Sequence, residues 1–534
     1  MSNNISRSEF LKTLTTAGLG IGLATNSLYT AFPKKKGSGE VESNSFKIRG
    51  FHIDMRIEIM TMPALKDFAK YLSGLGINAL ILEYAASYPY ETQATITGPN
   101  AYTRKELTDF ISYCNELGIQ VIPLLENLGH VQYILRHERY ADLRIEHNIL
   151  SQVDPLNKNC IILFNDLMED LISLHPSKYI HLGGDETRHL QNKKFEVYIK
   201  KNGVSKLYTQ YMKQICDIAI LKGKTPLLWA DMILRHPEAV TDLPIDKIIF
   251  INWIYDGANA DKFGSVKALQ EKGCTFWGAP ALRSGPDDYY LTGWKYHFDN
   301  IEKFVPYCRQ VDYKSIVMTS WSTSGVYDYK WGFSDALLEM FPVRNVYPLV
   351  GFNILVAAYS KALNIDDAID PEEFVIDYGQ KHFGLSEEDG AVLWNYLAHD
   401  QVVIRAGKNI DEENISKIRK DFREVSQPIR LMKPKINQKE FEHFRLMADI
   451  RLFYLSVRQV EAITESSNFN LSQRDRIGKL LKPLMIISKE LNSRFIDLNE
   501  GYLFPSELDR LNGLRNERLN RLCCVYGISP TTLP

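Results

Sequence analysis

Short apolar runs alternate with amphipathic helical patterns between about residue 46 and residue 360 of this chain. Such alternation is typical of βα units. It predicts eight strands, at residues 46–54, 78–84, 119–124, 179–183, 225–230, 247–252, 273–277 and 316–321. Eight units over this length predict an α/β fold of the (β/α)8 TIM-barrel type. An open doubly wound sheet is the alternative, but no glycine-rich phosphate loop opens any of the predicted helices.

The strand pattern stops after about residue 365, and residues 370–534 read as helical throughout. Their charged faces alternate with apolar stripes, which fit packing inside the protein or a homodimer interface equally well. One stripe consists of Ile450, Leu452, Phe453, Leu455 and Val457. We therefore predict three units: a signal and linker at 1–45, a catalytic barrel at 46–362, and a C-terminal all-α helical module at 363–534.

The amino-terminal segment has the features of an export signal. Arg7 and Lys12 precede an apolar stretch at residues 14–28, in a pattern that resembles a twin-arginine signal with Ser8 in place of one arginine. The stretch is too short and too rich in glycine for a good membrane span. We expect export, with the periplasm as the implied destination, and no integral membrane span.

Composition excludes several classes of function. The formal net charge of −2 gives no reason to expect nucleic acid or an anionic membrane as a partner. The seven cysteines are odd in number and lack any CxxC or metal-type spacing, so neither a disulfide framework nor a zinc site is expected. No His/Asp/Glu set has a spacing that demands a metal.

One predicted strand ends in two glycines and two neighbouring carboxylates, Gly183-Gly184-Asp185-Glu186. The glycines allow a sharp turn and the close approach of a ligand. Catalytic residues of an α/β barrel lie at the carboxyl ends of its strands. Adjacent carboxylates there suit one acid and one stabilising group with separately tuned pKa values. Asp185-Glu186 could instead cap the next helix, but the glycine pair and the surrounding strands favour a catalytic pair.

Further polar and aromatic residues fall at the ends of the other predicted strands, which a barrel brings to one rim. These candidates are Arg49, Asp54, Glu83, His130, Trp229, Asp231, Trp253 and Trp321. Glu83 and Asp231 are expected to bind sugar hydroxyls through charge-assisted hydrogen bonds, or else to pair with a helix lysine or arginine. His130 is expected beside the acid, where it helps to set the acid's pKa.

With these residues in view, residues 46–360 resemble the catalytic domain of glycoside hydrolase family 20, the β-N-acetylhexosaminidases. The resemblance rests on His181-Leu182-Gly183-Gly184-Asp185-Glu186 and is supported by the order of the three tryptophans. Within the family the chain is most similar to the hexosaminidase D branch, which lacks the small α/β domain usually found before the barrel. That similarity is carried by Leu82-Glu83-Tyr84, Tyr88-Pro89-Tyr90-Glu91, Trp229-Ala230-Asp231-Met232 and Thr319-Ser320-Trp321.

The resemblance implies an exo-acting enzyme that removes terminal β-linked N-acetylhexosamine by substrate-assisted hydrolysis, without a cofactor. Glu186 would act as general acid and then as base, and Asp185 would orient the 2-acetamido group and stabilise an oxazolinium-like intermediate. Either Tyr289 or Tyr290 would bond the acetamido carbonyl oxygen. The positions of the residues also favour this mechanism. A protein nucleophile and its acid must lie on opposite sides of the sugar, and carboxylates of neighbouring residues do not easily do so.

Two departures from the family pattern leave the sugar preference open. Ala85-Ala86 stands where hexosaminidase D-like chains carry an acidic pair, and Thr323 stands where many members have a glutamate. Two rival functions follow. One is a glycan-binding barrel without turnover, and the other is a glycosidase that uses distant carboxylates, such as Glu83 with Glu186, on sugars without an acetamide.

Overall fold

The computed structural model describes residues 46–257, 259, 262–323, 345–404 and 411–528. The predicted signal and linker at residues 1–45 lie outside the described residues, so export stays a prediction. Within the described ranges, no helix combines the length and the apolar composition that a bilayer crossing requires.

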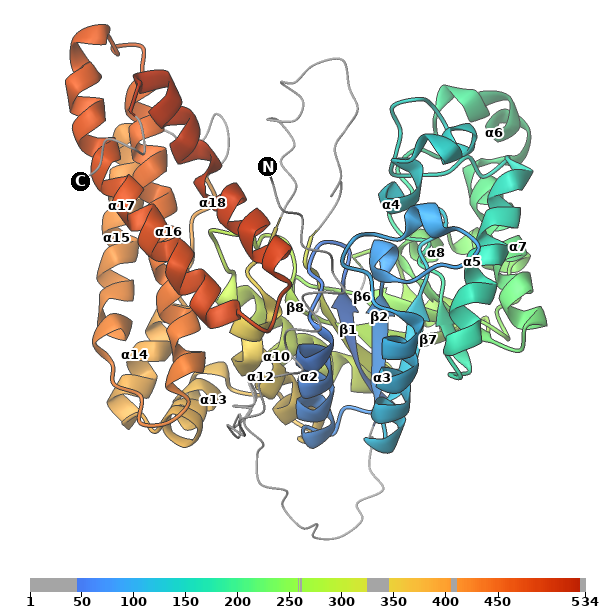
Figure 1. Ribbon diagram of the computed structural model, residues 1–534. Coiled ribbons are helices and arrows are strands. Elements are labelled where there is room, and N and C mark those ends of the chain that lie inside the picture. The colour runs from blue at the N-terminus through green and yellow to red at the C-terminus, as the bar shows by residue number, and fades with distance from the viewer. Residues whose placement is uncertain (1–45, 258, 260–261, 324–344, 405–410, 529–534) are drawn as a thin grey trace, which may run out of the picture.

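The described strands form one parallel sheet that closes on itself (Figure 1). Pairing runs from β1 through β7, and β9 pairs with both β7 and β1 and so completes the barrel. The short β8 follows β7 after Pro280 and pairs with the end of β9. All eight predicted strands are confirmed as β1 (Ile48–Asp54), β2 (Ala79–Glu83), β3 (Gln120–Leu124), β4 (Tyr179–His181), β5 (Thr225–Trp229), β6 (Ile249–Trp253), β7 (Thr275–Ala279) and β9 (Ser315–Ser320), with β8 at Ala281–Arg283.

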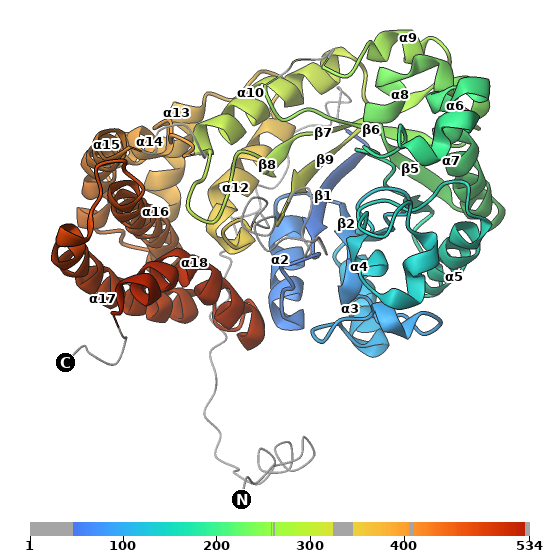
Figure 2. The same ribbon diagram turned by 90° about the horizontal axis from the view of Figure 1, so that it is seen from above.

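Helices connect the strands and surround the barrel (Figure 2). Thr103 caps the helix that begins at Arg104, and both reciprocal hydrogen bonds of a capping box with Glu106 are present. The helices of this part are α2 (Met62–Gly74), α3 (Arg104–Glu116), α4 (Gln132–Leu135), α5 (Lys158–Leu174), α6 (Glu196–Asn202), α7 (Val204–Leu221), α8 (Asp231–Arg235), α9 (Val266–Gln270), α10 (Trp294–Gln310) and α12 (Asn353–Leu363).

The barrel interior is filled by alternate residues of each strand, because successive side chains of a strand point to opposite faces. Apolar side chains such as Ile81, Ile122, Leu227, Ile251 and Val317 form one buried cluster inside the barrel. At the carboxyl ends of the strands, the same inward-facing positions are occupied by polar or aromatic residues. These are Asp54, Glu83, His181, Trp229 and Trp253. Strand periodicity therefore aims polar and aromatic side chains into one end of the barrel.

The C-terminal part is helical, as predicted, and lies beside α2, α10 and α12 (Figure 2). Its apolar core is continuous with the core between the barrel and its helices. The predicted stripe from Ile450 to Val457 is buried on α16, so those residues serve packing inside the protein. The exact domain boundary at residues 362–363 stays a prediction. The helices are α13 (Pro371–Tyr378), α14 (Glu387–Leu397), α15 (Glu412–Leu431), α16 (Gln438–Thr464), α17 (Arg474–Asn499) and α18 (Pro505–Tyr526).

Candidate active site

The two neighbouring carboxylates lie on a sharply turned segment directly after β4. Gly183 and Gly184 have φ of +58° and +92°, a region that favours glycine. A Cβ on Gly183 would overlap Oε2 of Glu126, so the glycine also makes room for a buried carboxyl group. Glu186 itself has φ of +43°, which is uncommon for a residue with a side chain. The segment thus has a strained backbone at the place where the sequence predicts chemistry.

His130 contacts both carboxylates. Its Nε2 lies 3.3 Å from Oδ2 of Asp185 and 3.6 Å from Oε2 of Glu186. Burial alone would lower the pKa of His130, but the charge and hydrogen bond of Asp185, with Glu186, outweigh burial and raise it well above its usual value. The imidazolium form therefore bridges the pair. The position beside the acid is the expected one, whereas the contact with Asp185 was not predicted.

Glu186 is also in contact with a second cation. Nη2 of Arg188 lies 2.9 Å from Oε1 of Glu186. Burial acts to raise the pKa of Glu186, but the hydrogen bond and charge of His130, together with Arg188, bring it down to about 2. Glu186 is consequently ionised in the free protein, and its backbone N–H donates to Oδ2 of Asp231 at 3.3 Å.

Two further carboxyl groups near Asp185 have raised pKa values. Burial first, and then the negative charge of Asp185, raises the pKa of Asp231 to about 7. The same two causes raise the pKa of Glu126 well above its usual range. Since carboxylates gathered in a buried space cannot all ionise together, the site retains protons that the sequence alone does not reveal. Oδ1 of Asp185 and Oδ1 of Asp231 are buried without a hydrogen-bond partner among the described residues.

A buried ionic network lies at the ends of β1 and β2. Nε of Arg56 lies 2.9 Å from Oδ1 of Asp54 and 2.9 Å from Oε1 of Glu83. Oε2 of Glu83 also lies 3.2 Å from Nε2 of His52. Oδ2 of Asp54 accepts hydrogen bonds from the backbone N–H groups after β9, including that of Thr323. The predicted pairing of Glu83 with a cation is present, but the cation comes from a loop rather than a helix.

Tryptophans from β5, β6 and the end of β9 stand next to this network. Trp229 and Trp321 have ring centroids 5.8 Å apart, and Trp321 lies 4.6 Å from the ring of His52. Nε1 of Trp321 donates to the hydroxyl oxygen of Tyr255 at 2.8 Å. Tyr255 in turn lies 5.2 Å from the ring of Trp253. Three of the predicted tryptophans and one tyrosine therefore form an aromatic enclosure.

The structure does not bring all predicted residues to this place. Arg49 lies near the amino end of β1, beside Gly76, about five residues and roughly 17 Å of extended chain before Asp54. Tyr289 accepts a hydrogen bond from Arg515, and Tyr290 donates to the carbonyl oxygen of Leu514. Both tyrosines fasten a loop to α18, so the prediction that one of them contacts an acetamido group has no support in these contacts.

Sequence reasoning missed Arg56, Glu126, Arg188 and Tyr255 as site residues. Arg56 and Glu126 lie two residues beyond strand ends, and Arg188 lies two residues after the acid. Tyr255 follows Trp253 at the same spacing of two. Including the two residues after each strand end finds Arg56, Glu126 and Tyr255, because the loops at the carboxyl ends of barrel strands build the site. Arg188 lies farther from the end of β4 and is found only from its position two residues after Glu186.

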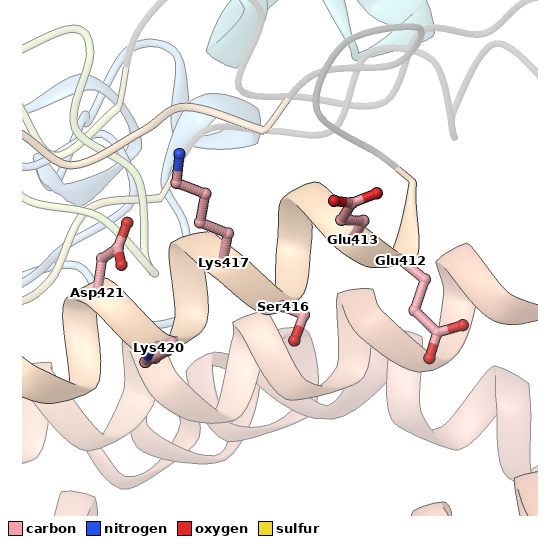
Figure 3. Close-up of a pocket in the computed structure, with 6 residues that line it drawn as sticks. All are labelled: Glu412, Glu413, Ser416, Lys417, Lys420 and Asp421. Atoms are coloured by element: carbon pink, nitrogen blue, oxygen red, sulfur yellow. The ribbon is translucent and has the colours of Figure 1, made fainter.

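A hollow lies on α15, far along the chain from the strand ends (Figure 3). Its lining consists of Glu412, Glu413, Ser416, Lys417, Lys420 and Asp421. All six come from one helix, and charges of both signs alternate along it, as on a solvated helix face. Within the described residues, no group of three or more His, Cys, Asp or Glu side chains is arranged to hold a metal ion.

The model of the glycosyl hydrolase family 20 catalytic domain matches residues 48–280. The barrel is therefore similar to the catalytic domain of glycoside hydrolase family 20. The family 20 match covers β1 to β7 and includes both neighbouring carboxylates, His130, Trp229 and Trp253.

Two curated hexosaminidases are similar to this chain. Human hexosaminidase D is 26% identical over 262 residues, which cover 46% of this chain and 53% of the relative. Bovine hexosaminidase D is 25% identical over 313 residues, which cover 55% of this chain and 88% of the relative. The chain thus spans only about half the length of the human protein. A solved β-N-acetylhexosaminidase from Bacteroides fragilis is 17% identical with a TM-score of 0.46, over 65% of this chain and 71% of that one.

Proposed function

We propose that this protein is an exo-acting β-N-acetylhexosaminidase that uses the substrate's own acetamido group as the nucleophile. The observation that carries the proposal is that Asp185 and Glu186 both contact one nitrogen of His130. A retaining pair that forms a covalent enzyme intermediate holds its carboxylates about 5 Å apart with the sugar between them. Here both carboxylates face one nitrogen of His130 and do not lie on opposite sides of a sugar-sized space. A neighbouring acetamido group can supply the missing nucleophile.

In the proposed reaction Glu186 protonates the glycosidic oxygen as the bond to the anomeric carbon breaks. The acetamido carbonyl oxygen attacks that carbon and forms an oxazolinium-like ring. Asp185 accepts a hydrogen bond from the acetamido N–H and stabilises the positive charge of the ring. Glu186, now ionised, then takes a proton from water as the water attacks the anomeric carbon. Two inversions give a product that retains the β configuration.

The aromatic enclosure suits the acetamido group. Trp229 and Trp321 form apolar walls for its methyl group and exclude water. The hydroxyl of Tyr255 accepts from Trp321, which leaves its own proton available for the acetamido carbonyl oxygen. We assign to Tyr255 the contact that the family resemblance implied for Tyr289 or Tyr290. Preorganised donors of this kind stabilise charge that develops in the transition state.

The ionic network of Arg56, Asp54 and Glu83 suits the hydroxyl groups of a terminal sugar. Its groups are buried at the ends of β1 and β2. Buried charged groups at the strand ends suit the hydroxyl groups of one terminal sugar, as the proposed exo action requires. The rival use of Glu83 as a distant catalytic carboxylate is not supported, because both of its oxygens already contact cations or His52.

The assay that tests the proposed function is p-nitrophenol release from the β-N-acetylglucosaminide, the β-N-acetylgalactosaminide and the plain β-glucoside. Only the two acetamido sugars should be hydrolysed, and Glu186→Gln should abolish turnover. Glu196→Gln is the matched control, because Glu196 is an exposed glutamate on α6 that pairs with Lys200. Hydrolysis of the plain glucoside would contradict the substrate-assisted mechanism, and tight binding of N-acetylglucosamine without turnover would favour a glycan-binding protein.

We also propose that the protein is exported, as residues 1–45 resemble a twin-arginine signal. Cell fractionation of the full chain against an Arg7→Gln variant tests this point. Retention of both forms in the cytoplasm would contradict it.

A further inference from the structure

A buried ion pair joins the barrel to its C-terminal helices next to the aromatic enclosure. Glu58 lies in the loop after β1, and Arg283 is the last residue of β8. Nη1 of Arg283 donates to Oε2 of Glu58 at 2.5 Å. Arg283 is fully buried and Glu58 is 6% exposed. A buried pair of this kind is rarely more stable than well-packed apolar residues, so its presence calls for a reason beyond stability.

One side of the pair is connected to Trp321. Nε of Arg283 donates to the hydroxyl oxygen of Ser320 at 3.0 Å. The backbone carbonyl oxygen of Arg283 accepts from the backbone N–H of Trp321 at 2.9 Å. Arg283 therefore holds both the residue before Trp321 and the backbone of Trp321 itself.

The other side is connected to the C-terminal part of the chain. Oε1 of Glu58 accepts from the hydroxyl of Tyr502, in the turn between α17 and α18, at 3.3 Å. The same oxygen accepts from the backbone N–H of Leu349 at 3.0 Å. Nη1 of Arg283 also donates to the carbonyl oxygen of Tyr347, whose hydroxyl bonds His443 on α16 at 2.7 Å. The pair is thus oriented by groups from α16 and from the turn before α18.

We propose that Glu58 and Arg283 are positioning residues that fix Trp321 and transmit the docking of the C-terminal helices to the reaction. This inference rests on the proposed function, in which Trp321 encloses the acetamido group. The multiple acceptors around the guanidinium permit a single orientation of Arg283, since its donors lie in a fixed plane. The helices are then part of the catalytic apparatus rather than a separate attachment to the barrel.

Mild substitutions at the two ends of the connection test the proposal. Replacing Arg283 itself would leave Glu58 buried without its cation, which threatens folding. Ser320→Ala removes the bond on the Trp321 side, and Tyr502→Phe removes the bond from the helical side. The matched control is Tyr359→Phe, because the buried hydroxyl of Tyr359 donates to the carbonyl oxygen of Gly50, away from the site.

A double-mutant cycle with Trp321→Phe separates positioning from simple stabilisation. Ser320→Ala and Tyr502→Phe should each lower kcat on the p-nitrophenyl acetamido substrate by about five- to tenfold, with KM changed less than about twofold. In the Trp321→Phe background the same changes should alter kcat by less than about twofold, because the positioned residue is gone. Tyr359→Phe should leave kcat unchanged in both backgrounds.

Equal losses in both backgrounds, or an unchanged kcat in Tyr502→Phe, would overturn the proposal and leave the pair a stabilising role only. The same cycle can be measured as the affinity of each variant for N-acetylglucosamine by calorimetry. This measurement tests the positioning role even if the protein shows no turnover. Absence of turnover in the unaltered protein would count against the proposed function alone. Additive losses of affinity would count against the positioning role.

Discussion

The guanidinium of Arg188 lies 2.9 Å from Oε1 of Glu186, and the arginine side chain is about two-thirds exposed. A cation at this distance stabilises the carboxylate and opposes protonation. A general acid must nevertheless hold a proton when the substrate arrives. Binding of a sugar over Glu186 therefore has to separate the two side chains or exclude the water around them.

Replacing Arg188 with Met should move the pH dependence of the reaction. Removal of the cation raises the pKa of Glu186 from about 2 toward its ordinary value. Because kcat/KM falls as pH rises above the pKa of the acid in the free enzyme, its basic limb should shift upward by about one pH unit. Profiles from about pH 2 to pH 6 cover the limb of both forms and measure the shift. Arg188→Lys keeps the charge and should leave the limb in place, and an unmoved limb in the Met variant would refute the idea.

His130→Asn should reduce kcat while preserving the fold. Asn tolerates the left-handed backbone of residue 130, whose φ is +54°. It cannot supply the positive charge between Asp185 and Glu186, so we expect kcat to fall roughly 100-fold. Melting temperature checks the fold. His130→Leu serves as the contrast, since it should lose the same activity and additionally about 1 kcal/mol of stability from backbone strain.

Asp231→Asn should stabilise the protein at alkaline pH. The folded-state pKa of Asp231 is raised to about 7, above its value in an unfolded chain. The folded protein favours the neutral form of Asp231. The stability that this form gives is fully present below the unfolded pKa and is lost as pH rises through about 7, where the buried carboxyl group ionises. An asparagine in the same shape has no charge to lose, and its carbonyl oxygen can still accept from the N–H of Glu186.

The melting temperature of Asp231→Asn should therefore exceed that of the unaltered protein at about pH 8, and the difference should vanish near pH 4. Scanning calorimetry at both pH values provides the comparison. A difference of the same size at the two pH values would mean that packing, and not ionisation, dominates at this position.

Gly183→Ala should be much more costly than a similar change elsewhere. The new Cβ would overlap Oε2 of Glu126, in addition to the strain at φ +58°. Gly118→Ala is the matched control, because Gly118 has φ of +75° but a methyl group there would meet no atom beyond its chain neighbours within 4 Å. We expect about 1 kcal/mol of lost unfolding free energy at residue 118 and at least twice that at residue 183. Equal losses in urea titrations would contradict the close contact.

The barrel could be predicted from sequence because each strand is a short apolar run bounded by turn residues. The period of two then placed Glu83, Trp229 and Trp253 at one rim without further information. Asp185 and Glu186 were found for the same reason, since they follow a strand directly. Local pattern and strand direction were sufficient for these residues.

Arg49 and the two tyrosines show where local pattern fails. Arg49 lies on the correct strand but is its second residue, at the end of the barrel opposite to the site. Tyr289 and Tyr290 bond to residues more than 220 positions later in the chain. No local pattern reports contacts of that length. Raised pKa values, as at Asp231, likewise depend on burial among residues from several strands.

Three residues with side chains adopt left-handed backbone angles after β2, β3 and β4: Ala85 at φ +45°, His130 at φ +54° and Glu186 at φ +43°. Each conformation costs on the order of 1 kcal/mol, and all three belong to the same rim. A screen for heat-resistant variants would reward glycine or asparagine at these positions and so discard the reactive groups at two of them. Efforts to make the protein more robust should therefore leave this rim untouched and seek their gains in the outer helices.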